Sequence, residues 1–228
     1  MKTRFAVVLG TGLLLGGCFD AHYDVALNND GSGTLVIDVV LDKALSRDIL
    51  KEGKGKLGQE MPVKSLGKNA VESQRVENGS IVIRQSLAFK TLSDITAPGV
   101  DIEVQDLGRN LVGVDRSRIR FGTGHDPAVP KNDKNSAFAS ALAAQMFKGH
   151  EMRVTMHLPC VVENAESMKS DDAVYAPKVE TSWFHGSKVE WRLPMSAMME
   201  LSRQQQDFAV TCWSFKGIPA GRSGTGKK

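Results

Sequence analysis

The sequence has only three cysteines in 228 residues, and it lacks the motifs that mark common enzymes. It contains no His-Glu-x-x-His pair of metal ligands, and Gly31-Ser32-Gly33 lacks the spacing of a nucleophile elbow. The run from Gly221 to Lys227 imitates a phosphate-binding loop, but Lys228 stands where that loop requires Ser or Thr. His125-Asp126 is an isolated pair without further ligands beside it. We therefore expect that the protein is not an enzyme and that it has no metal site and no cofactor.

The chain also lacks a charge excess once its first 17 residues are set aside. These residues carry two of the 29 Lys and Arg and none of the 26 Asp and Glu, which leaves 27 basic against 26 acidic residues. Because nucleic-acid binders normally concentrate basic residues, we expect no nucleic-acid partner. No later stretch approaches the roughly 18 apolar residues of a membrane-spanning helix, so the sequence predicts no second membrane span.

The N-terminus has the parts of a bacterial secretion signal. Lys2 and Arg4 form a basic start, and an apolar run over 5–15 follows, too short to span a bilayer stably. Leu15-Gly16-Gly17-Cys18 then resembles a lipobox, at which a lipoprotein is acylated on its cysteine and cleaved. This pattern predicts a signal peptide over 1–17 and a lipid anchor on Cys18. The alternatives are a plain signal peptide with an incidental cysteine, or a retained N-terminal helix.

A lipid anchor at this position would hold the protein close to the membrane. Two or three acyl chains bind a bilayer firmly, whereas one chain binds only marginally. Three residues separate Cys18 from the first predicted strand, and such a tether reaches only about 10 Å. We expect the folded body to lie near the lipid headgroups, on the periplasmic or extracytoplasmic side of the bacterial envelope.

The two remaining cysteines form an even pair. The alternation of side chains along each predicted strand places Cys160 and Cys212 on its apolar face. The envelope is also an oxidising compartment. We predict a buried disulfide between them. The alternative is two buried free thiols, since cysteine is a common core residue.

Apolar and polar residues alternate through most of the chain, which predicts strands joined by tight turns. Asn78-Gly79 is the strongest turn signal, and Asn29–Gly33, Gly108–Asn110 and His185-Gly186 are the others. The expected hairpins pair 22–28 with 34–42, 70–77 with 80–90, 101–106 with 111–121 and 178–184 with 187–193, with further strands at 151–158 and 207–215.

One main helix is predicted over Ser136–Lys148. Phe138, Leu142 and Met146 form its apolar stripe, and Gly149 follows as a stop. The pattern as a whole predicts an α+β fold, in which a mostly antiparallel curved sheet of successive hairpins packs on this helix in a helix-grip-like arrangement. A single domain would cover residues 18–216, and a disordered polar tail would cover 217–228.

Arg116, Arg118 and Arg120 point to one side of the strand predicted over 111–121. Three guanidiniums in a row could bind phosphates or lipid headgroups. The alternative is an ordinary solvated face of a sheet. These three residues are the ligand-binding residues that the sequence suggests.

The order of these parts resembles the LppM-type bacterial lipoproteins, a family of poorly defined function. The resemblance rests on the lipobox at Cys18 and on the segment Val25–Thr34. It rests also on His157–Ala165, which is similar to the family's LPG-V-x-x-Asn segment, and on Ser187–Leu193, which is similar to its V-x-W strand. Cys160 departs from the family pattern, which tends to have Gly there. Many members also carry a C-terminal transmembrane helix, whereas the last residues of this sequence are polar. The resemblance implies a curved antiparallel sheet around a long helix, and no catalytic residues.

These observations together predict a non-enzymatic binding or scaffold module of the bacterial cell envelope. It would be attached to the membrane through its N-terminal lipid and would bind a lipid, another hydrophobic ligand or an envelope protein. The alternatives are a structural subunit of an envelope protein complex and an envelope hydrolase built around His125 and Asp126.

Overall fold

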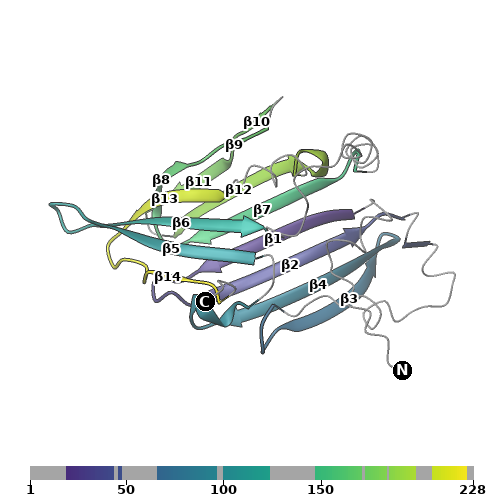
Figure 1. Cartoon of the computed structure of the whole chain (residues 1–228), viewed down its shortest axis with the longest axis horizontal. Helices are drawn as coiled ribbons and strands as arrows, with labels where there is room; N and C mark the ends of the chain where they lie inside the picture. The colour runs from purple at the N-terminus through teal and green to yellow at the C-terminus, as the bar shows by residue number, and fades with distance from the viewer. Residues whose placement is uncertain are drawn as a thin grey trace, which may run out of the picture.

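The computed structural model describes residues 19–43, 46–47, 66–96, 100–123, 147–170, 173–183, 185–198 and 207–224. Most of these residues belong to strands, which form two sheets and a short two-stranded ribbon (Figure 1). Several sequence predictions lie outside the described residues: the signal peptide, the lipidation site Cys18, the pair His125-Asp126, and all but the end of the helix predicted over Ser136–Lys148.

The larger sheet has seven strands in the order β11-β12-β7-β1-β2-β4-β3. Its central pair, β1 and β7, is parallel, and every other pair is antiparallel. The parallel pair joins the early hairpins to the late ones. The strands are β1 (Phe19–Leu27), β2 (Gly33–Leu41), β3 (Val71–Glu77), β4 (Ser80–Phe89), β7 (Glu151–Leu158), β11 (Lys178–Ser182) and β12 (Gly186–Pro194).

The second sheet has five strands in the order β14-β5-β6-β13-β8, all antiparallel. A short 3-10 helix, η2 (Leu92–Asp94), lies between β4 and β5, and β9 and β10 form the separate ribbon. The strands are β5 (Val100–Arg109), β6 (Asp115–Thr123), β8 (Val161–Ala165), β9 (Met168–Lys169), β10 (Val174–Tyr175), β13 (Phe208–Ser214) and β14 (Gly221–Arg222).

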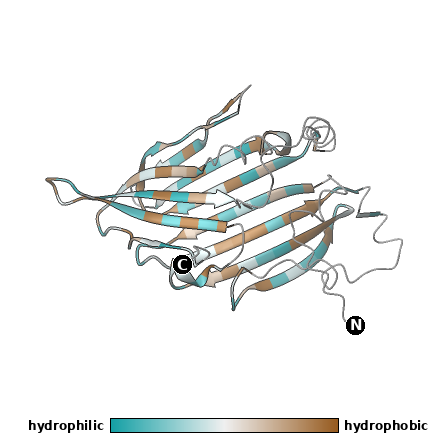
Figure 2. Cartoon of the chain, viewed as in Figure 1, coloured by the Kyte–Doolittle hydropathy of each residue, from teal (hydrophilic) through white to brown (hydrophobic). Residues whose placement is uncertain are grey.

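The two sheets pack face to face and share one core. Brown and teal residues alternate along the strands (Figure 2), as expected where one face of each sheet is buried. Aromatic contacts cross between the sheets, with ring centroids 5.5 Å apart for Trp191 and Phe208 and 5.6 Å apart for Tyr23 and Phe121. The core includes Val25, Leu35, Leu87, Val154, Met156, Val189 and Trp191 from the larger sheet, and Ile102, Val104, Ile119, Phe121, Phe208, Val210 and Cys212 from the second.

The predicted α+β fold, with one main helix packed on a curved sheet, is wrong, because the chain is mostly β-strand. The hairpins do not all add to one sheet. β5, β6 and β13 form a second sheet that covers the apolar face of the larger one. The second sheet therefore buries the surface that the prediction had assigned to the helix.

The predicted hairpin turns are confirmed at Asn78-Gly79 and shifted in the β5–β6 hairpin. Asn78 and Gly79 both have positive φ, 50° and 83°, as a two-residue turn with matching twist requires. In the β5–β6 hairpin, Gly108 lies inside an irregular part of β5, and the chain reverses between Asn110 and Val114. The hairpin is therefore longer than the sequence predicted.

Residues 217–224 correct the prediction of a disordered tail from residue 217. β14 pairs with β5 at the edge of the second sheet, and the Ser223 backbone N–H donates to the Ile102 carbonyl at 2.8 Å. Arg222 donates to both carboxylate oxygens of Asp101, and this hydrogen bonding holds the pKa of Asp101 below its ordinary value. The Gly- and Pro-rich composition of this segment gave no sign of edge pairing.

Candidate functional site

The candidate site is a cleft of about 380 Å³ at one end of the sandwich. Four turns, β1–β2, β5–β6, β7–β8 and β11–β12, meet there with the end of β13. We call it the aromatic cleft, because its walls include Trp183, Trp213 and Phe215. Its other lining residues include the apolar Val114, Pro159 and Val161 and the polar Asn29, Ser182, His185, Ser214 and Lys216.

The aromatic walls of the cleft are open to solvent. Trp183 is 71% exposed and Phe215 is 73% exposed. Trp213 is half-buried, and the guanidinium of Arg116 lies over its ring, 5.3 Å from the centroid. Single exposed apolar side chains are common on proteins, but a cluster of large ones around a hollow marks an interaction site.

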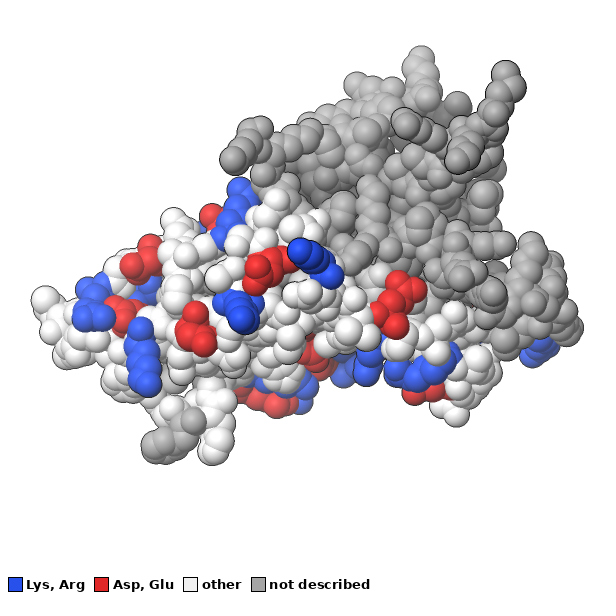
Figure 3. Space-filling model, turned by 90° about the horizontal axis from the view of Figure 1, so that it is seen from below, with Lys and Arg blue, Asp and Glu red and all other residues white. Residues whose placement is uncertain are grey.

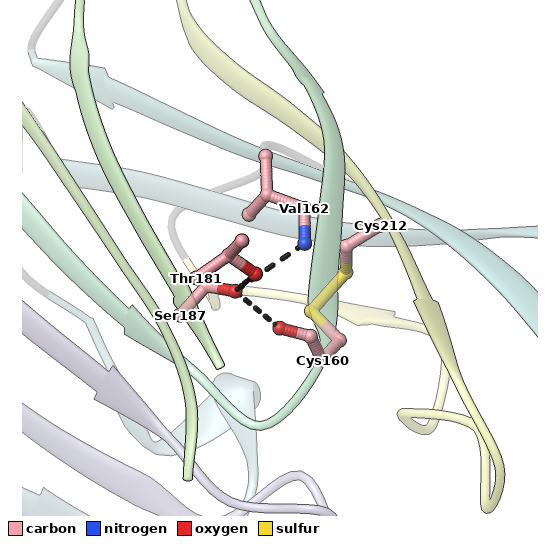
Figure 4. Close-up of a disulfide and its surroundings, with 5 residues drawn as sticks. All are labelled: Cys160, Val162, Thr181, Ser187 and Cys212. Atoms are coloured by element: carbon pink, nitrogen blue, oxygen red, sulfur yellow. Dashed lines mark hydrogen bonds between the residues drawn. A yellow bond between two sulfur atoms is a disulfide. The ribbon is translucent and has the colours of Figure 1, made fainter. Parts of the chain in front are cut away.

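Cys160 lines the cleft, and its disulfide bond to Cys212 has a Cα–Cα distance of 5.8 Å (Figure 4). The bond fixes the β7–β8 turn to β13 of the second sheet. The Ser187 hydroxyl donates to the Cys160 carbonyl at 2.7 Å, and it contacts the Thr181 hydroxyl at 2.7 Å. The predicted pairing is thus present, and the hydroxyl network beside it ties β11 and β12 to the same wall.

One buried hydroxyl in the cleft wall is unpaired. Ser214 is only 7% exposed, and its Oγ has no hydrogen-bond partner among the residues that the structure describes. Ser214 has the inward parity of β13, like Phe208, Val210 and Cys212. An unpaired buried hydroxyl is destabilising by about 1–3 kcal/mol.

A second and more polar cleft, of about 500 Å³, lies on the other side of the β11–β12 turn. It shares Pro159, Ser182, His185 and Gly186 with the aromatic cleft. Gly186 has φ of 78°, and a Cβ there would lie 2.2 Å from the Leu158 carbonyl oxygen. Only glycine allows this close approach, so the turn that separates the two clefts depends on it.

Arg116, Arg118 and Arg120 do share one face of β6, on the outside of the second sheet, and each is paired with a carboxylate. Arg116 donates to both oxygens of Glu163, and Arg118 donates to Glu166 at 2.7 Å. Arg120 pairs with Glu103, Asp207 and Asp101. An anionic ligand would have to compete with these acidic partners. Anion binding by the three arginines stays a prediction.

The surroundings of the arginines are also electrically mixed. A cleft of about 640 Å³ beside Arg118 is lined by Glu166, Asp207 and Lys169 as well. On the face of the molecule shown in Figure 3, Lys and Arg are interspersed with Asp and Glu. Neither feature concentrates positive charge as an anion site would require.

Two of the described histidines, His150 and His157, pair with separate carboxylates. His150 Nδ1 lies 3.2 Å from Asp20 Oδ1, and His157 Nε2 lies 3.5 Å from Asp24 Oδ2. Within the described ranges, no group of three or more His, Cys, Asp or Glu side chains could hold a metal ion. In the same ranges, no helix has the length and apolar character needed to cross a membrane.

The sequence analysis missed the aromatic cleft. Trp183 and Phe215 each stand directly after a described strand, and Trp213 lies on the outward face of β13. Large aromatic residues at strand ends were the available signal. They could not be grouped, because the turns that bring them together are far apart in the sequence.

Comparison with known proteins gives little further information. No protein-family model matches the chain, and no curated protein matches it. The NMR structure of the folded domain of LppM from Mycobacterium tuberculosis is similar over 92% of this chain and 95% of that domain, with 10% sequence identity and a TM-score of 0.42. At this identity and TM-score, membership of the LppM-type family stays a prediction.

Proposed function

We propose that this protein is a lipid-anchored, non-enzymatic binding module on the extracytoplasmic side of the bacterial cell envelope, and that the aromatic cleft binds part of a lipid or another hydrophobic molecule. The anchor is inferred from Leu15-Gly16-Gly17-Cys18. The disulfide between Cys160 and Cys212 fits an oxidising compartment. The aromatic cleft, with its exposed Trp183 and Phe215, is the observation that carries the proposal.

The chemistry of the cleft suits a molecule that is apolar on one side and polar on another. Trp183 and Phe215 offer flat apolar surfaces, while His185 and Lys216 supply hydrogen-bonding groups. Ligand sites in proteins combine apolar walls with a few placed polar groups, in volumes of about 300–1,000 Å³. At about 380 Å³, this cleft has room for a segment of a lipid rather than a whole one.

Native mass spectrometry of residues 19–228, secreted to the periplasm and purified without detergent, tests the ligand. We expect a reproducible extra mass that is released as a small hydrophobic molecule on denaturation. Replacing Trp183 and Phe215 together by alanine should lower ligand occupancy at least about tenfold, because two apolar contact surfaces are lost. Val71→Ala is the matched control, since Val71 is also exposed but lies on β3. A bare polypeptide mass for the unmodified chain would refute the ligand.

Metabolic labelling with a fatty-acid analogue tests the anchor. The full chain produced in bacteria should be labelled and should enter the detergent phase of a Triton X-114 partition, because its acyl chains are strongly apolar. Cys18→Ser should abolish the label. The double variant Cys160→Ala/Cys212→Ala should keep it, which assigns the label to Cys18. Absence of label from the unmodified chain would contradict the anchor and leave the cleft proposal standing.

A further inference from the structure

The tip of the β5–β6 hairpin, residues 107–115, extends beyond the rest of the second sheet (Figure 1). It presents aliphatic side chains to solvent. Leu111 is fully exposed, Val112 is 81% exposed, and Leu107 is also exposed. Isolated aliphatic side chains at the end of a projecting hairpin have no packing role in the fold. We propose that this hairpin tip inserts into a lipid surface.

The backbone of the tip is prepared for an apolar environment. The Asn110 side-chain oxygen accepts hydrogen bonds from the N–H groups of Val112 at 3.1 Å and Val114 at 2.9 Å. The backbone N–H of Asn110 donates to the Val114 carbonyl, and that of Gly113 donates to the Asn110 carbonyl, both at 3.0 Å. An unsatisfied backbone group is costly in lipid. These four N–H groups are already bonded within the tip, so they lose little when water is removed.

An ion pair sets the depth to which the tip can enter. Arg109 donates to both carboxylate oxygens of Asp115 at 2.6 and 3.0 Å, and this holds the pKa of Asp115 below its ordinary value. Leu111 and Val112 lie in the tight turn that the Gly113 N–H to Asn110 carbonyl hydrogen bond closes, directly beyond the Arg109–Asp115 pair. Interfacial protein segments enter the headgroup and acyl boundary by about 5–10 Å. The pair therefore sits at headgroup level, and because it is neutral overall, insertion should not require anionic lipid.

The shape of the tip favours lipid over a protein partner. A stable protein interface buries about 800 Å² on each partner. A narrow hairpin with three apolar side chains offers much less area to one side, whereas a bilayer surrounds the tip and buries Leu111 and Val112 from every direction. The rigid internal hydrogen bonds of the tip also mean that little conformational entropy is lost on insertion.

Insertion would bring the aromatic cleft to the membrane interface. Val114, at the base of the tip, lines the cleft together with Trp183 and Phe215. Aromatic side chains favour the headgroup region, and a lipid segment could then enter the cleft directly. This consequence rests on the proposed function, but the insertion itself does not. The tip lies at the opposite end of β1 from Phe19, so the contact is also separate from the proposed anchor (Figure 1).

A fluorophore at the tip tests insertion in the full chain. In Val112→Cys, an environment-sensitive NBD label can be attached to the new thiol, because Cys160 and Cys212 are paired. In phosphatidylcholine vesicles, we expect a blue shift and quenching by brominated lipid. The control is Lys90→Cys, since exposed Lys90 directly follows β4 at the same end of the sandwich. Its label should keep a water-like emission.

Substitutions at Leu111 make the test quantitative. Leu111→Asp should lower the insertion equilibrium constant at least about tenfold, because one aliphatic contact is lost and a charge is added. Leu111→Phe should preserve insertion. Both variants should unfold at the same temperature as the unmodified chain, since this side chain is fully exposed.

Two outcomes would overturn the proposal. One is an emission from position 112 that matches position 90 in every vesicle. The other is a blue shift that occurs only with a fraction of envelope proteins and not with vesicles, which would assign the tip to a protein partner. If Cys18 carries no lipid, its thiol also takes the fluorophore, and the labelled chain is added to preformed vesicles. The emission from position 18 is then removed by making the same measurement in a Cys18→Ser variant. Insertion can thus fail or succeed independently of the anchor and of the cleft ligand.

Discussion

Replacing both Cys160 and Cys212 by alanine is expected to lower the free energy of unfolding by about 4 kcal/mol. The two residues are separated by 52 positions, so the bond removes a large closed loop from the freedom of the unfolded chain. It also joins the β7–β8 turn, which leaves the larger sheet, to β13, which lies between β6 and β8 in the second sheet. Urea unfolding of residues 19–228, followed by tryptophan fluorescence, measures the difference.

The reduced unmodified chain is the matched control for this variant, because it lacks the bond but keeps both buried side chains. It should unfold at nearly the same urea concentration as the double alanine variant. Equal stability of the oxidised and reduced chains would show that the shared core alone holds the sheets together. The variant should also lose cleft ligand, since Cys160 lies in the cleft wall.

Local turn chemistry explains why most strands could be predicted. β7 matches the predicted strand 151–158, and the hairpin around Asn78-Gly79 has its turn at the predicted residues. In each case the information lies within a few neighbouring residues. A period-two pattern requires an extended chain with one buried face, and Asn-Gly readily adopts the positive φ angles of the turn.

The division into two sheets could not be predicted in the same way. An alternating strand buries one face equally well against a helix or against another sheet, so the pattern does not identify the partner. The parallel pairing of β1 with β7 joins residues such as Tyr23 and Val154. No local signal specifies this contact across most of the chain. The Ala-rich stretch 136–148 has a helical pattern that is visible locally, so the prediction used it as the element that covers the apolar face of the sheet.

The same distinction applies to the candidate sites. That Arg116, Arg118 and Arg120 share a face follows from their spacing of two residues along β6. Their acidic partners, Glu163 and Glu166, come from β8 and the residue after it, nearly 50 positions later in the sequence. Pairing with these partners depends on tertiary structure alone. The aromatic cleft depends on it still more, because five separate segments supply its walls.

Replacing Trp191 by alanine should lower the free energy of unfolding by about 4 kcal/mol. The side chain is fully buried between the sheets, and it packs edge-on against Phe208 with ring centroids 5.5 Å apart. Its indole N–H donates to the Glu166 carbonyl at 2.9 Å, which links β12 to the segment after β8. The substitution leaves a large cavity and an unpaired carbonyl together. Urea unfolding of residues 19–228 measures the loss.

Two further substitutions separate these contributions. Trp191→Phe retains most of the ring volume but removes the N–H donor, so we expect an intermediate loss of about 2 kcal/mol. Trp183→Ala removes an exposed tryptophan from the cleft and should change the stability by about 0.5 kcal/mol or less. A loss for Trp191→Ala no larger than that for Trp183→Ala would contradict a shared core between the sheets. If the stability loss decreases from Trp191→Ala through Trp191→Phe to Trp183→Ala, stability depends on the tryptophan between the sheets. A loss of ligand in Trp183→Ala can then be assigned to the cleft, because that variant stays folded.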